Sequence, residues 1–336
     1  MKTGVKAISY YLPEKVVSNA DLVREFGTWT ENKIFNKTGI KERRVVTDEI
    51  VSDIAVKAAL KLFSENDIKT DEIDYLLLCT ECPDYFLPAT ACVVQDRLGL
   101  RKNIGAYDIN LGCSGFVYGL AAAKSLICAG MAQNVLFITA DTLTKTIHPM
   151  DKSTRTLFGD AAAAALVTKS DINGVLDFVF GTDGSGMNRL IIPAGAWAER
   201  SSEETRAEVT NRWGNIRTRE NLYMDGPEIM NFTLDVVPKM FEDVLTKNNM
   251  QFDDIDYVVF HQASLMLLEK LRNTLNIPED KFFINIQNKG NTAGCTIPLA
   301  LRDMQIQGLL KKSDKIMIIG FGVGLSYAGT IINWIM

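Results

Sequence analysis

Two similar segments restrict what this chain can fold into. Each begins with apolar residues at helical spacing and continues through Ile-Asp-Tyr into a short apolar run, Ile73–Cys79 in the first segment and Ile255–His261 in the second. The spacing predicts a helix, and the apolar run predicts a buried strand. A helix–strand unit that occurs twice indicates a fold made of two related halves.

The similarity extends through the elements that follow. In both segments a strand-like run leads into a glycine-rich turn, then an apolar helix, then a further strand. These are residues 104–110, 112–115, 116–129 and 134–139 in the first segment, and 282–287, 290–294, 298–307 and 315–320 in the second. Strands that alternate with helices in this way predict mostly parallel sheets with helices on their faces.

We therefore predict an α/β protein of two duplicated halves, packed about a pseudo-twofold axis. The halves comprise residues 1–170 and 171–336, because the polar stretch from Thr168 to Gly174 is typical of a boundary. Between Trp197 and Glu220 the chain becomes charged and polar, which predicts a surface excursion over one face.

Charge and composition exclude several classes of function. The 336 residues carry a net charge of −5 and no long basic run, so nucleic acid is not expected as a partner. The six cysteines are too few for a disulfide scaffold, and the first residues contain no apolar stretch of signal-peptide length, so we expect a cytoplasmic protein. Residues 316–336 are uncharged, but glycines interrupt them, so we expect two buried strands rather than a membrane span.

Cys113 stands where a predicted strand meets a predicted helix, between Gly112 and Gly115. Backbone N–H groups at a helix N-terminus favour negative charge, so a thiol in this position is expected to have a lowered pKa and to act as a nucleophile. The same N–H groups can hold the oxygen of an acyl intermediate. The alternative is a small buried cysteine in a tight turn.

His261 and Asn291 occupy related positions in the second segment. His261 ends a predicted strand, and side chains at the carboxyl ends of strands face the crevice where α/β sheets bind ligands. Asn291 lies in the turn that corresponds to the Cys113 turn. Either residue alone has a structural alternative, a hydrogen-bonded histidine or an ordinary turn asparagine. Together the three indicate a nucleophile with two hydrogen-bonding groups beside it.

Other motifs give weaker indications. His148 is interpreted as a loop histidine. Cys79 and Cys82 have the spacing of a redox or metal pair, but Pro83 prevents a helix from starting within it, so we assign no metal site. The glycines of Gly320–Gly324 lack the spacing of a dinucleotide-binding loop and are expected to let the backbone approach a ligand.

These motifs together resemble those of the β-ketoacyl-acyl-carrier-protein synthase III family of the thiolase superfamily. The matching blocks, in chain order, are Thr38–Arg44, Pro83–Tyr85, Asn110–Phe116, Leu157–Asp160, His261–Ser264, Gly290–Thr292 and Gly320–Gly324. The resemblance implies the five-layer αβαβα thiolase-like fold and a homodimer. It also implies condensation of a primer acyl thioester with malonyl-acyl-carrier-protein, the initiation of fatty-acid synthesis, with no cofactor beyond the thioesters.

The resemblance also implies a role for each site residue. Cys113 takes the acyl group, and the thioester oxygen is held by N–H groups at Cys113 and in the loop Phe321-Gly322-Val323. His261 and Asn291 bind the malonyl thioester oxygen and stabilise the enolate that forms as CO2 leaves. Such a decarboxylation needs donors aimed at the enolate oxygen rather than a general base.

Four positions depart from the family pattern, and all concern substrate binding. Lys33 replaces a tryptophan that stacks on the coenzyme A adenine, and Lys152 replaces an arginine near the nucleotide. Met266 replaces an arginine that docks the carrier protein, and Leu87 replaces a phenylalanine that lines the primer pocket across the dimer. We therefore expect a donor other than acetyl-coenzyme A. A basic cluster that would attract an acidic carrier protein comprises Lys33, Lys37, Lys41, Arg43 and Arg44.

Other functions remain open at this level. A specialised-metabolite ketosynthase with a non-acetyl donor uses the same residues, as do chalcone-synthase-like enzymes. A Cys-His acyltransferase or thioester hydrolase would use only the first half-reaction, and a catalytically silent scaffold would not need all of Cys113, His261 and Asn291. A His-His pair would indicate an elongating synthase, and a cysteine in the C-terminal glycine loop would indicate a degradative thiolase; the chain has neither.

Overall fold

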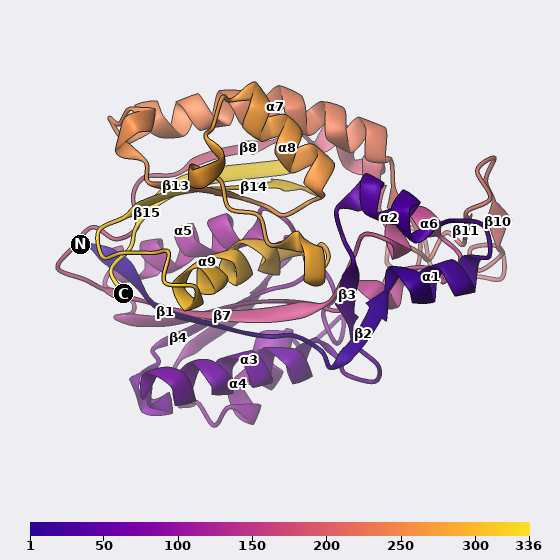
Figure 1. The fold of residues 1–336 in the computed structure, drawn as a ribbon. Coiled ribbons are helices and arrows are strands. Elements are labelled where there is room, and N and C mark those ends of the chain that lie inside the picture. Colours follow the sequence, from indigo (N-terminus) through magenta and orange to yellow (C-terminus); the bar gives the residue numbers. More distant parts are fainter.

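A computed structural model describes residues 1–336 and shows five layers in the order helix, sheet, helix, sheet, helix (Figure 1). Helices α3 (Val51–Asn66) and α4 (Thr90–Arg97) cover one outer face, and α7 (Gly226–Lys247) and α8 (Leu265–Thr274) cover the other. Helices α5 (Gly115–Cys128) and α9 (Thr296–Ile306) lie between the two sheets. The predicted αβαβα fold class is therefore confirmed.

The larger sheet has the strand order β1-β7-β6-β4-β5. Its strands are β1 (Thr3–Tyr11), β7 (Ala161–Lys169), β6 (Asn134–Asp141), β4 (Tyr75–Cys79) and β5 (Gly105–Ile109). Strand β4 runs parallel to β5 and β6, whereas β7 is antiparallel to both β1 and β6. Strand β5 is an edge strand, so its outer backbone groups have no partner within this sheet.

The smaller sheet has the order β13-β14-β15-β8. Its strands are β13 (Tyr257–Phe260), β14 (Lys315–Gly322), β15 (Ser326–Asn333) and β8 (Val179–Thr182). Only β13 and β14 pair in parallel. The prediction of mostly parallel sheets is therefore wrong, because the short turn between β14 and β15 makes them antiparallel neighbours. The run 282–287 also forms no strand; it contributes one bridge, between Phe282 and Val258.

The two Ile-Asp-Tyr segments have matching surroundings. The carboxylate of Asp74 accepts a hydrogen bond from the N–H of Asn134, the first residue of β6, at 3.0 Å. The carboxylate of Asp256 accepts one from the N–H of Lys315, the first residue of β14, at 2.8 Å. Each aspartate thus fixes the start of the strand next to its own, which explains why the motif precedes both strands. The division of the chain at residue 170 stays a prediction.

The remaining elements lie at one end of the layers (Figure 1). They are β2 (Lys15–Ser18), α1 (Asn19–Phe26), α2 (Glu31–Thr38), β3 (Glu42–Val45), α6 (Lys152–Arg155), β9 (Leu190–Ile191), β10 (Val209–Thr210), β11 (Ile216–Arg217) and β12 (Tyr223–Met224). The predicted surface excursion contains the small hairpin β10–β11, and both of its tryptophans are exposed, Trp197 at 72% and Trp213 at 67%.

Three apolar cores hold the layers together. The central core joins both sheets to α5 and α9, and the other two join each sheet to its outer helices. Because α5 is covered by sheets on two sides, its sequence is apolar nearly all round rather than along one stripe. The C-terminal segment forms the buried strands β14 and β15, as predicted, and no helix is long and apolar enough to cross a bilayer.

Candidate active site

Cys113 lies in the turn between β5 and α5, and its side chain is buried. The end of β14 packs directly against it. A Cβ atom placed on Gly322 would stand only 2.9 Å from the Cys113 sulfur and 2.8 Å from its Cβ, so no residue with a side chain fits there without displacing the cysteine. The glycine-rich C-terminal loop therefore lets the backbone approach the sulfur. The predicted approach of this backbone to a ligand stays a prediction.

The prediction of a lowered thiol pKa is wrong. Burial raises the pKa of Cys113 well above its ordinary value, and the nearby carboxyls of Glu81 and Asp141 raise it further. Backbone N–H groups of Val323 and Cys113 lower the pKa but do not offset these effects. The thiol is therefore protonated at neutral pH, and the two N–H groups are available to an oxyanion formed at this position.

His261 follows β13 and is buried. The backbone N–H of His261 donates to the carbonyl of Ile319 on β14 at 2.9 Å. The His261 ring lies edge-on to the ring of Phe321, with the ring centroids 5.5 Å apart. Its Nδ1 is 2.7 Å from the hydroxyl oxygen of Thr296, at the start of α9. Burial lowers the pKa of His261 to about 3, so the ring is neutral and carries one N–H group near pH 7.

Asn291 is also buried, in the turn before α9. Its backbone N–H donates to Leu157 at 2.9 Å, and its side-chain oxygen accepts the N–H of Ala293 at 3.0 Å. This second bond fixes the orientation of the amide, so that Nδ2 is directed toward the carbonyl of Ala263, at 3.4 Å. Because Nδ2 carries two protons, at least one remains for a ligand.

The contacts connect the three predicted catalytic residues through two short segments. The end of β14 contacts both Cys113, through Gly322 and Val323, and His261, through Phe321. The segment from Asn291 to Thr296 carries the asparagine and the hydroxyl that binds the His261 ring. The residues that sequence analysis identified separately thus belong to one buried polar site.

The other predicted substrate-binding residues lie on different segments. Lys33, on α2, places its ammonium group 4.7 Å from the centre of the Trp29 ring. Lys152, on α6, is buried and donates to the carbonyl of Gly214 in the β10–β11 hairpin at 2.7 Å. Leu87 is 81% exposed on the loop after β4.

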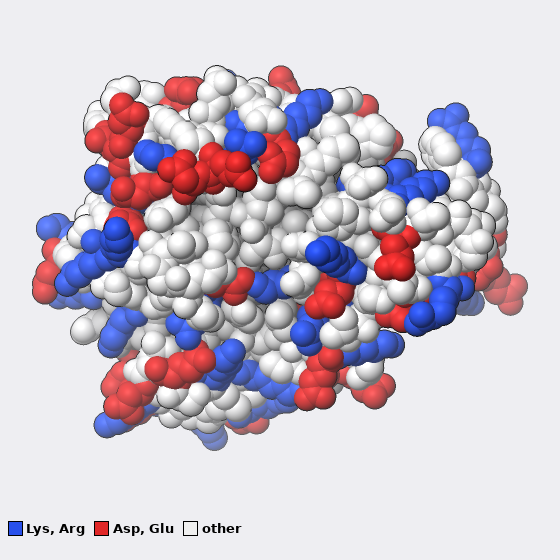
Figure 2. Space-filling model, in the orientation of Figure 1, with Lys and Arg blue, Asp and Glu red and all other residues white.

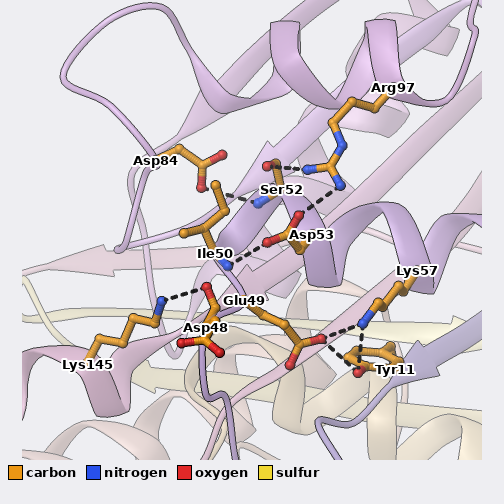
Figure 3. Close-up of polar contacts among 10 residues, drawn as sticks. All are labelled: Tyr11, Asp48, Glu49, Ile50, Ser52, Asp53, Lys57, Asp84, Arg97 and Lys145. Carbon is orange, nitrogen blue, oxygen red and sulfur yellow. Dashed lines mark hydrogen bonds and ion pairs between the residues drawn. The ribbon is translucent and has the colours of Figure 1, made fainter.

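The loop that carries Leu87 is anchored at its base (Figure 3). Asp84 accepts the N–H of Ser52, at the start of α3, at 3.2 Å, and its own N–H donates to Thr90 at 3.1 Å. Arg97 of α4 then donates to the Ser52 hydroxyl at 2.7 Å and to Asp53 at 2.8 Å. The network joins α3, α4 and the loop, so Leu87 is presented on a fixed base.

The predicted basic cluster is smaller than the sequence indicated. Arg43 is completely buried, where it donates to the carbonyls of Val17 and Thr156 and to the side chain of Asn19. It stabilises the packing of β2 and β3 and is not available to a partner. His148 forms a 3.1 Å contact with Glu208 through Nε2, consistent with a loop histidine.

Sequence analysis missed a pair of acidic residues beside Cys113. Asp141, at the end of β6, accepts the N–H of Glu81 at 2.7 Å and the hydroxyl of Thr80 at 3.2 Å, while its second oxygen is buried without a partner. Burial raises the pKa of Glu81 to about 7 and also raises that of Asp141. In the sequence, the one indication of this pair was Glu81, which lies inside the Cys79–Cys82 motif. That motif was assessed only as a cysteine pair for redox chemistry or metal binding.

Comparison with known proteins identifies relatives along the whole chain. Residues 107–184 match the family model described as 3-Oxoacyl-[acyl-carrier-protein (ACP)] synthase III, and residues 245–334 match the model of its C-terminal part. A beta-ketoacyl-[acyl-carrier-protein] synthase III from Clostridium tetani is 38% identical over 97% of this chain and 96% of its own length.

Solved structures show the same fold. A crystal structure of a 3-oxoacyl-(acyl-carrier-protein) synthase III has a TM-score of 0.97 and 43% identity, covering 99% of this chain and 100% of its own. The priming β-ketosynthase of the R1128 polyketide pathway has a TM-score of 0.86 at 27% identity, covering 99% of this chain and 96% of its own. These neighbours confirm the thiolase-like fold class.

Proposed function

The chain belongs to the 3-oxoacyl-[acyl-carrier-protein] synthase III family, and from this premise we propose that it condenses an acyl thioester primer with malonyl-acyl-carrier-protein. The product is a 3-oxoacyl thioester, and the reaction initiates fatty-acid synthesis. The observation that carries the proposal is the end of β14, which contacts Cys113 through Gly322 and His261 through Phe321. A single strand end therefore joins the proposed nucleophile to a proposed donor.

In the first half-reaction the sulfur of Cys113 attacks the primer carbonyl. A carbon–sulfur bond forms to Cys113, and the bond to coenzyme A or the carrier breaks. The N–H groups of Cys113 and Val323, which act on the sulfur in the free protein, are suited to bind the carbonyl oxygen as it becomes negative. The departing thiolate takes up the proton that Cys113 gives up.

In the second half-reaction the malonyl group loses CO2, and the resulting carbanion forms a carbon–carbon bond to the acyl carbon held on Cys113. The carbon–sulfur bond to Cys113 then breaks, and the released thiolate takes up a proton from solvent. His261 and Asn291 donate to the enolate oxygen that develops during decarboxylation. This role requires the ring proton of His261 to be on Nε2, with Nδ1 accepting from the Thr296 hydroxyl, a tautomer that the 2.7 Å contact between Nδ1 and that hydroxyl permits. Both half-reactions rearrange bonds of the two thioesters only, so the proposal requires no further cofactor.

Asn291 separates this proposal from a Cys-His acyltransferase or hydrolase. An acyl transfer to water needs one oxyanion site and a base that activates the water. Neutral His261, with its lowered pKa, is a poor base, and a second buried donor at Asn291 has no function in hydrolysis. Two donors beside the nucleophile instead suit the enolate of a decarboxylating substrate.

The surface at α2 supports an acyl donor that is bound to an acidic carrier protein. Lys33, Lys37 and Lys41 are exposed, and Figure 2 shows basic side chains, with acidic ones among them, over the region of α1, α2 and the β10–β11 hairpin. The ammonium groups of Lys33 and Lys37 lie 4.7 Å and 4.9 Å from the centre of the Trp29 ring. A free adenine would have to displace these lysines to stack on that ring, whereas an acidic helix would bind them in place.

The unpaired edge of β5 supports a homodimer. An exposed strand edge is a template for pairing with another chain, and Tyr107 on β5 is 39% exposed. Beside it, the anchored loop exposes Phe86 at 76% and Leu87 at 81%. A second copy that pairs through β5 would cover these side chains, and Leu87 would then reach the partner's acyl site. The six free cysteines fit the cytoplasmic location of such an enzyme.

The oligomeric state tests the dimer directly. Analytical ultracentrifugation is expected to give twice the chain mass of 37.3 kDa. The double variant Phe86→Asp/Leu87→Asp should shift the protein toward monomer, because it places charges in the proposed interface. Leu60→Asp, on the outer surface of α3 and 50% exposed, is the matched control and should leave the dimer intact. A wild-type protein that sediments as a monomer at every concentration would contradict the dimer.

A panel of thioesters tests the reaction and its donor. Each acyl-coenzyme A and acyl-carrier thioester is incubated with the enzyme, and intact mass reports an adduct on the chain; malonyl-acyl-carrier-protein is then added, and 3-oxoacyl product is measured. We expect adduct, CO2 and product, with a higher specificity constant for a carrier-bound or non-acetyl donor than for acetyl-coenzyme A. Adduct without decarboxylation would identify an acyltransferase, and preference for acetyl-coenzyme A would show that Lys33 and Met266 are neutral replacements.

A further inference from the structure

The protonated thiol of Cys113 needs a group that accepts its proton during acylation. Sulfur attacks a thioester as the thiolate, and burial together with two neighbouring carboxyls keeps this thiol neutral. His261 is a poor base because its pKa is lowered to about 3 and its Nδ1 is bonded to Thr296. The helix N-terminus supplies N–H donors but no base. The proton acceptor must therefore be sought among the other groups around the turn.

Glu81 is the side chain that the geometry favours. Its carboxyl group lies against the backbone of Gly112, the residue that precedes Cys113: a Cβ on Gly112 would stand 2.0 Å from one carboxyl oxygen and 2.7 Å from the other. Gly112 therefore permits this close approach. Asp141 is less suitable, because one of its oxygens already accepts two hydrogen bonds and the other is buried near Gly294, 3.8 Å from the position of a Cβ on that residue.

We propose that Glu81 is the acid–base residue of the acylation half-reaction. Its carboxylate accepts the thiol proton of Cys113, directly or through one water, as the new carbon–sulfur bond forms. The same proton then passes to the sulfur of coenzyme A or the carrier as the old carbon–sulfur bond breaks, so Glu81 ends the step as a carboxylate. This assignment rests on the proposed function, because it needs Cys113 to be the acylated residue.

The pH dependence follows from the charge of Glu81. The titratable groups that face it are Asp141 on β6, Cys79 on β4, Cys82 on its own segment, and Cys113. Below about pH 7 the carboxyl is protonated and cannot accept a proton, so acylation is expected to slow as the pH falls through this value. Alkylation of Cys113 by iodoacetamide also needs a thiolate, but the leaving iodide needs no proton. The alkylation rate should therefore rise only at the higher pH where the thiol itself ionises.

Single-turnover acylation, followed by intact mass, tests the proposal with Glu81→Gln. The loss of a positioned base is worth about 10²-fold or more in rate, so this variant should acylate at least that much more slowly and lose the pH dependence near neutrality. Its alkylation by iodoacetamide should be unchanged or faster, because removal of a negative charge lowers the pKa of the thiol. Glu81→Asp should restore part of the acylation rate.

Several results would overturn this role. Acylation of Glu81→Gln at the wild-type rate or faster would show that Glu81 only raises the thiol pKa. Equal slowing of acylation and alkylation would show lost access to the sulfur rather than lost proton transfer. If the variant does not fold, the pH dependence of the two rates in the wild-type enzyme still tests the proposal. Acylation and alkylation with the same pH profile would exclude a base other than the thiolate itself. Acylation on a residue other than Cys113 would instead reject the proposed function itself.

Discussion

Replacement of Cys113 with alanine is expected to abolish the acyl-enzyme and to lower condensation by about 10⁴-fold or more, the order of loss that follows removal of a covalent nucleophile. The carbanion from malonyl decarboxylation then has no enzyme-bound thioester to attack. Cys113 is buried against Gly322, and an alanine side chain is smaller than the cysteine side chain, so it fits the site without a clash. The variant should therefore fold and dimerise like the wild-type protein.

The measurement is intact mass after incubation with an acyl thioester, followed by peptide mapping of the wild-type adduct. Cys128→Ala is the matched control, since this cysteine is exposed at the end of α5 and its loss should leave acylation unchanged. An adduct that persists in Cys113→Ala, or that maps to Cys79, Cys82 or Cys295 in the wild-type chain, would contradict the assignment of the nucleophile.

The order of helices and strands in the layers could be predicted because short sequence patterns mark where these elements begin. The Ile-Asp-Tyr repeat marks the entrance to β4 and β13, and in both copies its aspartate binds the first N–H of the adjacent strand. The apolar sequence of α5 similarly reflects its position between two sheets. These features are visible in the sequence because the motif and the apolar run are local patterns, although the aspartates bind strand residues 60 and 59 positions away.

The thiol pKa could not be predicted in this way. A cysteine before a helix is expected to be acidic. Burial has the largest effect and raises the pKa of Cys113, and the carboxyls of Glu81 after β4 and Asp141 on β6 raise it further, so distant segments decide it. Arg43 shows the same limit, because a cationic side chain in a basic run is solvated unless distant segments bury it, as Val17 and Thr156 do here. Strand direction also depends on which elements become neighbours, which explains the antiparallel pairs.

Alanine at His261 or Asn291 is expected to separate the two half-reactions. Each substitution removes one donor to the enolate oxygen and should lower malonyl decarboxylation by about 10²- to 10³-fold, the usual effect of losing an oxyanion donor. Acylation of Cys113 should remain measurable, because neither side chain supplies the N–H groups that bind the primer oxygen. If both donors serve the same oxygen, the double variant should lose less than the product of the two single losses.

Decarboxylation is followed by release of CO2 from malonyl-acyl-carrier-protein, and acylation by intact mass of the same samples. Asn291→Asp keeps the size of the side chain but removes both N–H donors, so it should be at least as slow as Asn291→Ala if donation is what matters. His148→Ala is the control for the loss of a histidine, since His148 contacts Glu208 rather than the site. Loss of acylation in the His261 and Asn291 variants with decarboxylation spared would reverse the proposed roles, because the two side chains would then serve the primer and not the malonyl group.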